Sequence, residues 1–176
     1  WDSLAVQPWF TATAANVGYG YWSHDIGGHF GTPGAELYTR WVQFGAYSPV
    51  LRTHATKDPD QERRFWEFND PYRSVMVDSV RRRYELVPYL YGQCREALES
   101  GMSAIRPMYH DDPEPDDAYR AEGQYRFGDS FIVAPVVQPL EEDLMAPVRV
   151  WLPKGRWYDT ALGQSLNVRS ARGMWF

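Results

Sequence analysis

Strand-like and helical stretches alternate over the first part of the chain, and this order limits its possible folds more than any other pattern. Gly18 to His24 is an aromatic run typical of a strand, Glu36 to Ala46 has apolar residues at helical spacing, and Ser48 to Leu51 is short and apolar before a long helical pattern begins. This order is typical of α/β folds with a parallel sheet. Two such units are too few to close a barrel, and alone they would expose apolar faces. We therefore expect one segment of a larger barrel or doubly wound sheet.

Polar side chains gather where each predicted strand ends. Ligands of parallel sheets bind at the carboxyl ends of the strands, and Trp, Asp, Arg and His side chains are suited to gripping a polar ring. Asp25 and His54 could hydrogen-bond sugar hydroxyls, while Arg52 could pair with Asp25 or with another carboxylate. The alternatives are a buried aromatic strand whose polar tail satisfies a turn, and a loop histidine at position 54 with partners of its own. The residues concerned are Trp22, His24, Asp25 and His29 at the first strand, and Arg52 and His54 at the second.

Two further helices are predicted from capping signals. Asp2-Ser3 can cap a short helix through Phe10. Asn69-Asp70-Pro71 is a favourable helix start, and the apolar repeat that follows it continues to about Ser100. Pro88 predicts a kink within this long helix.

The composition of the sequence changes after Gly101, where Pro, Asp and Gly become frequent. Strand-like runs occur at Phe131 to Val137 and at Val148 to Leu152, with turns at Pro153-Lys-Gly155 and Leu162-Gly163. We expect a small β domain and place the boundary near Ile105, which divides the chain into residues 1–105 and 106–176. We also expect this second domain to be incomplete at Phe176.

Composition and motif content exclude several classes of function. The net charge of −5 argues against a nucleic-acid surface, and there is no apolar run long enough to span a membrane. Cys94 is the single cysteine, so neither a disulfide framework nor a cysteine metal site is expected. The spacing of His24, Asp25 and His29 matches no helical zinc motif, and the chain has no dinucleotide, phosphate-loop or serine-elbow motif. We therefore expect no metal and no cofactor.

Several short sequence blocks stand out along the chain. They are Trp22-Ser-His-Asp-Ile-Gly-Gly28, Leu51-Arg-Thr-His-Ala55, Leu86-Val-Pro-Tyr-Leu-Tyr91, Ile105-Arg-Pro107, Gln124-Tyr-Arg-Phe-Gly-Asp129, Ile132-Val-Ala-Pro-Val136 and Leu152-Pro-Lys-Gly-Arg-Trp-Tyr158. In this order and at this spacing, the blocks resemble glycoside hydrolase family 31, and their combination is far more specific than any one of them. The resemblance covers Trp1 to about Gly163 and implies the C-terminal segment of a (β/α)8 TIM barrel, followed by the start of the β-sandwich domain beside it.

This resemblance implies retaining hydrolysis of α-glycosides by two aspartates, and neither aspartate is expected within this chain. The nucleophile's block is absent, and the acid/base block is expected just upstream of Trp1. Asp2 follows that position and begins a helix, so we do not assign it a catalytic role. We expect an inactive fragment whose partners are an oligosaccharide substrate and the missing N-terminal part of the same polypeptide.

The resemblance also implies roles for individual residues. His54 matches the histidine that binds hydroxyls of the cleaved sugar, and Asp25 matches an aspartate that orients its polar neighbours and contacts the sugar. We expect Trp22 to form part of the pocket wall and Arg52 to support the sugar-binding side chains. His29, followed by Phe30, stands where many members have an aromatic residue. This departure leaves both glucose and xylose open at the inner subsite, and we expect terminal α-linked glucose.

Two other classes of protein compete with a glycosidase fragment. A carbohydrate-binding module would use the tryptophans for stacking, and the aromatic content of 16% is compatible with that use. A structural interaction domain would bury the aromatic residues as core. The alternating strands and helices and the long helix argue against a lectin-like β-sandwich.

Overall fold

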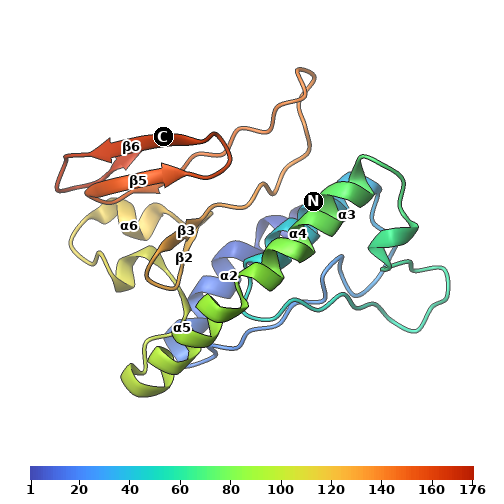
Figure 1. Ribbon diagram of the computed structural model, residues 1–176, viewed down its shortest axis with the longest axis horizontal. Helices are drawn as coiled ribbons and strands as arrows, with labels where there is room; N and C mark the ends of the chain where they lie inside the picture. The colour runs from blue at the N-terminus through green and yellow to red at the C-terminus, as the bar shows by residue number, and fades with distance from the viewer.

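Helices dominate the first part of the chain and short antiparallel strands dominate the rest of the computed structural model, which describes residues 1–176 (Figure 1). The α-helices are α1 (Asp2–Ala5), α2 (Gln7–Thr13), α3 (Ala35–Ala46), α4 (Tyr72–Glu85), α5 (Val87–Ser100) and α6 (Asp116–Arg120). Single 3-10 turns are η1 (Ala14–Val17), η2 (Phe65–Glu67) and η3 (Met108–His110). No helix is both long and apolar enough to cross a bilayer.

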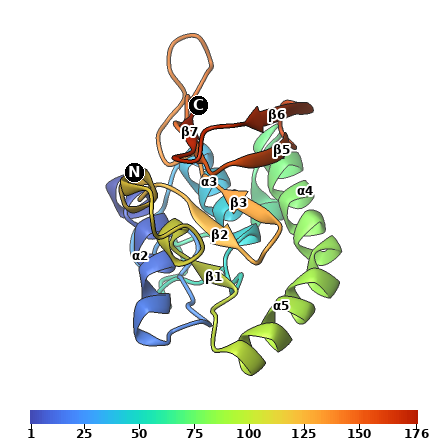
Figure 2. The ribbon, with the colours of Figure 1, turned by 90° about the vertical axis from the view of Figure 1, so that its left-hand side faces the viewer.

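Three small antiparallel sheets follow α5. β1 (Ile105–Arg106), β2 (Tyr125–Phe127) and β3 (Phe131–Val133) form the first, in that order. β4 (Trp151–Leu152) pairs with β7 (Met174–Trp175), and β5 (Gly155–Asp159) forms a hairpin with β6 (Gln164–Val168). Figure 2 shows the three-stranded sheet between α2 on one side and the α4–α5 pair on the other.

The two predicted parallel segments lie side by side, but they do not form regular strands. Their contact consists of two isolated parallel bridges, Ser23 with Val50 and Ile26 with Thr53. The prediction of strands over residues 18–24 and 48–51 is therefore wrong in extent, although the parallel direction is confirmed. A parallel ladder is regular only when neighbouring strands support it, and within residues 1–176 neither segment has another strand beside it.

The helical predictions are largely confirmed, with differences at two ends. The predicted helix 36–46 is α3, and the long helix breaks at Leu86, where Pro88 lies in the first turn of α5. The first helix is instead split into α1 and α2 at Val6, and the expected cap at Asp2-Ser3 is wrong because Asp2 is already helical. Pro8 sits in the first turn of α2, where a missing N–H costs nothing, so this helix continues beyond Phe10.

The strands of the second part are shorter than predicted. The run 131–137 yields only β3, and the run 148–152 yields only β4. The predicted turn at Leu162-Gly163 joins β5 to β6, a hairpin whose strands the sequence pattern did not single out. The short helix α6 was not predicted either. The division at Ile105 stays a prediction.

One core joins the helical part to the first sheet. Tyr38 and Phe44 of α3 are buried in the same cluster as Tyr125 and Phe127 of β2. The Tyr125 hydroxyl also donates to the carbonyl of Tyr47 at 3.0 Å. These contacts fix α3, and with it the segments on either side of that helix, against the sheet.

Candidate functional site

The two parallel bridges carry Asp25 and His54 to the same end of the paired segments. The Ile26 amide donates to the carbonyl of Arg52 at 3.0 Å, directly beside both residues. Ile26 is fully buried against Gly45, so its packing on α3 holds the two paired segments in place. The predicted shared edge for Asp25 and His54 is therefore present in the structure.

Four of the predicted residues form one cluster at this edge, which we call the Asp25 cluster: Asp25, His29, Arg52 and His54. His29 Nδ1 and Asp25 Oδ2 are hydrogen-bonded at 2.8 Å, and Arg52 Nη2 donates to the other oxygen, Oδ1. The His29 and His54 rings lie 5.4 Å apart, centre to centre. Asp25 is thus held from two sides, while His54 has no side-chain hydrogen bond and is exposed. An exposed imidazole beside a fixed carboxylate can bind a hydroxyl group.

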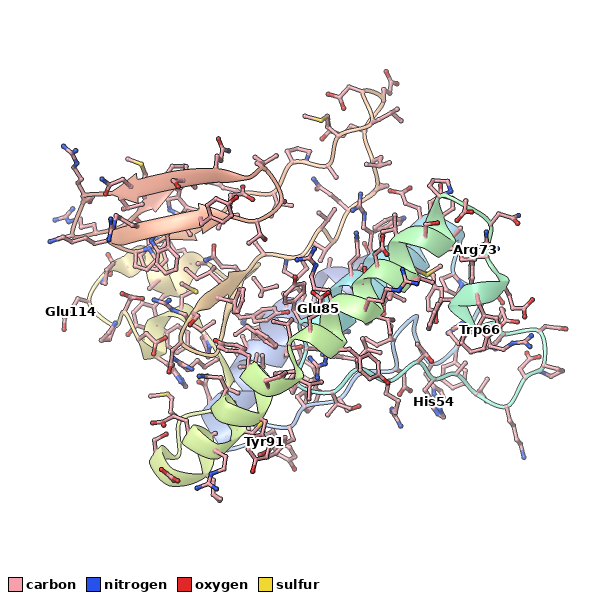
Figure 3. The ribbon with its side chains drawn as sticks, viewed as in Figure 1. His54, Trp66, Arg73, Glu85, Tyr91 and Glu114 are labelled. Atoms are coloured by element: carbon pink, nitrogen blue, oxygen red, sulfur yellow. The ribbon has the colours of Figure 1, made fainter.

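His54 also lies at the wall of an open hollow of about 340 Å³. The hollow is lined by polar residues that follow the second parallel segment, among them Asp58, Glu62 and Arg64. Hydrogen bonds from Arg64 lower the pKa of Glu62 to about 2, so this carboxylate is ionised. In Figure 3, His54 lies at the lower right of the view, far from the β5–β6 hairpin at the upper left.

Phe30 joins the Asp25 cluster, whereas the contacts of Trp22 lie elsewhere. The Phe30 ring meets His29 edge-on at 4.5 Å and is 77% exposed. Trp22 packs edge-on against Phe10 at 4.8 Å and Tyr19 at 6.2 Å, and its buried Nε1 has no partner. The role of Trp22 as a pocket wall therefore stays a prediction.

His24 points into the protein rather than toward the Asp25 cluster. Its Nε2 lies 2.6 Å from Thr11 Oγ1, and its ring is 5.0 Å from that of Phe44. Burial lowers the pKa of His24 to about 4, against the opposing charge of Asp25. His24 is therefore neutral near pH 7 and packed inside the protein. The prediction that it would bind a ligand together with Asp25 and His29 is wrong. Successive residues of an extended segment point to opposite faces, which separates it from Asp25.

A metal ion would find ligand atoms here, but it would have to compete for them. One ligand atom each from Asp25, His29 and His54 lies within 4.8 Å of the others. Both oxygens of Asp25 are already engaged, one by His29 and one by the Arg52 cation. Each oxygen keeps a further lone pair, but a cation bound there would be repelled by the Arg52 cation beside it.

The sequence did not point to Arg63, whose side chain holds the glycine turn that carries His29. It is 7% exposed and donates from Nη2 to the carbonyls of Gly28 and Gly31, at 2.7 and 2.8 Å. No local pattern could have found it, because 35 residues separate Arg63 from Gly28.

Both parts of the chain match models of one enzyme family. The model described as "Glycosyl hydrolases family 31 TIM-barrel domain" matches residues 1–93, and "Glycosyl hydrolase family 31 C-terminal domain" matches residues 101–173. Neutral alpha-glucosidase C of Mus musculus is 33% identical over 91% of this chain and 18% of its own length. Alpha-xylosidase of Saccharolobus solfataricus is 32% identical over 95% of this chain and 23% of its own length.

Solved structures give the same result. A GH31 dextranase of Flavobacterium johnsoniae complexed with glucose superimposes with a TM-score of 0.87, at 28% identity, covering 100% of this chain and 21% of the dextranase. The glucosidase II alpha subunit gives a TM-score of 0.86 at 26% identity, covering 99% and 18%. The chain therefore spans about a fifth of the length of these relatives.

Proposed function

Because the chain belongs to glycoside hydrolase family 31, we propose that it is the sugar-binding part of a retaining α-glycosidase that removes terminal α-linked glucose from oligosaccharides. The observation that carries this proposal is the convergence of Asp25, His29 and His54 at one edge, beside an open polar hollow. Two imidazoles and a fixed carboxylate supply both donors and acceptors for the hydroxyls of a sugar.

His54 is the residue that we expect to contact the sugar directly. Its ring is exposed and has no side-chain partner to give up, so binding a hydroxyl costs no internal hydrogen bond. Asp25 is held by Arg52 and His29, which fixes its orientation before the sugar arrives. Such preorganisation raises affinity because less freedom is lost on binding.

Bond cleavage requires groups that the Asp25 cluster does not supply. A retaining glycosidase needs a nucleophilic carboxylate and an acid/base carboxyl roughly 5 Å apart. The cluster holds a single carboxylate, and both of its oxygens are engaged. We propose that the two catalytic aspartates lie on polypeptide outside residues 1–176, and that this chain alone is inactive. Turnover of nitrophenyl α-glucoside by the chain alone, persisting through rigorous purification, would contradict this.

Replacing His54 in the full-length protein that contains this chain tests the proposal. We expect His54→Ala to lower kcat/KM for nitrophenyl α-glucoside about 100-fold, the size of effect seen when one well-placed donor is removed from an active site. His110→Ala is the matched control, because His110 bonds to Asn16 from η3, outside the Asp25 cluster, and should leave kcat/KM unchanged. Normal efficiency in His54→Ala would indicate a purely structural histidine.

Two alternatives remain distinguishable from an α-glucosidase. The first is an α-xylosidase, which the similarity to the Saccharolobus enzyme supports and which would cleave nitrophenyl α-xyloside faster than the glucoside. A non-catalytic carbohydrate-binding module would bind oligosaccharides without cleaving either compound, even in the full-length protein. Comparing the two chromogenic substrates separates all three possibilities.

A further inference from the structure

Arg63 is a buried cation whose partners are backbone carbonyls. Its Nη2 donates to Gly28 and Gly31, and its Nη1 donates to the carbonyl of Glu62 at 2.8 Å. The two glycine carbonyls belong to residues 27–31, the turn that presents His29 and Phe30. A guanidinium presents N–H groups on three nitrogens in a rigid planar fork, and the N–H groups of a lysine ammonium, all on one nitrogen, do not reproduce that spread.

The turn is shaped around this side chain. Gly27 has φ +100°, and a Cβ added there would lie 2.7 Å from Arg63 Nε and 2.8 Å from Tyr38 Cε2. The Tyr38 hydroxyl donates to the Arg63 carbonyl at 2.5 Å, and the Arg63 guanidinium carbon is 5.9 Å from the centre of the Tyr38 ring. Tyr38 is fully buried in α3, so Arg63 connects the turn to the protein core.

A second set of bonds joins the turn to the segment that follows His54. The Thr56 amide donates to the carbonyl of His29 at 2.9 Å, and Thr32 Oγ1 donates to the carbonyl of Asp60 at 3.2 Å. The segment from His54 to Arg63 therefore returns to the His29 turn at several points. The relative position of the two imidazoles depends on this connection.

We propose that Arg63 is a positioning residue that sets the spacing between His29 and His54, and through it the affinity for the sugar. This inference rests on the proposed function and deepens it. Arg63 lies at the edge of the hollow beside His54, but its Nη1 and Nη2 donate to backbone carbonyls, so it holds the turn rather than the sugar. Its loss loosens the turn, moves His29 relative to Asp25 and His54, and weakens binding more than it slows bond cleavage.

The test uses the full-length protein and compares Arg63 with a second arginine of similar chemistry. Arg83 also donates to backbone carbonyls, those of Ala46, Ser48 and Pro49, but these lie at the opposite end of the second parallel segment. We expect Arg63→Lys to raise KM about tenfold with kcat changed less than twofold. Arg83→Met should lower the thermal midpoint and leave KM unchanged.

A double-mutant cycle separates positioning from general destabilisation. If Arg63 acts through His29, then Arg63→Lys should raise KM much less in a His29→Ala background than in the wild type. In Arg63→Ala, millimolar guanidinium should partly restore KM by filling the vacated site. If Arg63→Ala does not fold, the milder Arg63→Lys still gives the result.

The inference is overturned if folded Arg63→Lys has a normal KM, if Arg83→Met raises KM equally, or if the effect of Arg63→Lys persists undiminished without His29. Its failure differs from that of the proposed function. If His54→Ala lowers kcat/KM but Arg63→Lys leaves KM normal, only the positioning role of Arg63 is refuted. If His54→Ala has no effect, the sugar site itself is wrong.

Discussion

The two arginine–aspartate clusters of this molecule use the same chemistry in different surroundings. In the Asp25 cluster, the side chains of Arg52 and Asp25 are 51% and 23% exposed, and imidazoles stand beside them. In the second cluster, at β1 and β2, the Arg106 side chain is 5% exposed and is bound by Asp111 and Asp129, both with Nη2–Oδ distances of 2.9 Å.

The clusters also differ in how fully their donors are used. All three guanidinium nitrogens of Arg106 donate, to Asp111, Asp129 and the Ser103 carbonyl. Arg52 directs a single hydrogen bond to Asp25. A buried arginine whose donors are all used has none left for a ligand, whereas the half-exposed Arg52 keeps donors free. Ion pairing alone therefore does not identify a binding site in this protein.

Asp111→Asn should give the largest effect, and it should be on stability. Asp111 forms an ion pair with Arg106, and its Oδ2 also lies 3.1 Å from Arg126 Nε, although this second contact lacks hydrogen-bond geometry. Asp111→Asn therefore removes a negative charge beside two arginines. Leaving the buried Arg106 cation without this charged partner costs about 3 kcal/mol, which urea unfolding of the full-length protein would measure. KM should not change. Asp117→Asn is the control, because the side chain of its partner Arg120 is 72% exposed. An equal loss in both variants would refute the distinction between the clusters.

Acid should weaken the fold through His24, the buried neighbour of Asp25. Burial lowers the pKa of His24 from 6.5 to about 4, so the unfolded chain takes up a proton first as the pH falls. The stability from neutral His24 is complete above pH 6.5 and is lost as the pH falls toward 4, about 2 kcal/mol of it between pH 7 and pH 5. Unfolding of His24→Leu across this range should show a flatter dependence. An unchanged slope would mean that another group titrates.

Asp25→Asn should reduce sugar binding with little effect on stability. The amide keeps an acceptor for His29 but loses the charge that holds Arg52, in a pair that is half exposed. We expect KM to rise about tenfold, which corresponds to about 1.4 kcal/mol, with a free energy of unfolding within about 1 kcal/mol of the wild type. A large loss of stability with normal KM would make the Asp25 cluster resemble the Arg106 cluster.

Local signals predicted the parts of the fold that local interactions determine. The apolar repeat predicted α3 almost to the residue, and Pro88 predicted the break between α4 and α5. The shared edge of Asp25 and His54 followed from the parallel order of the elements, which the isolated bridges preserve. The sequence blocks predicted the family, which both family models confirm.

Contacts between distant residues were beyond the same reasoning. The grip of Arg63 on Gly28 and Gly31 depends on the path of the chain in space and has no periodic signature. The extent of a strand depends on its neighbours, so an apolar run such as 131–137 overstated β3. His24 and Asp25 are adjacent in sequence, and packing against α3 determines which of them is buried.

Arg81→Ala should give the smallest effect and marks the lower limit of the comparison. Arg81 and Asp78 of α4 are 3.4 Å apart and both side chains are 74% exposed, so water already satisfies them. An exposed pair of this kind contributes at most about 0.5 kcal/mol, because ordering two long side chains offsets a weak attraction. Urea unfolding should therefore place Arg81→Ala within that range of the wild type. A loss approaching that of Asp111→Asn would show that exposure does not separate structural from dispensable ion pairs in this protein.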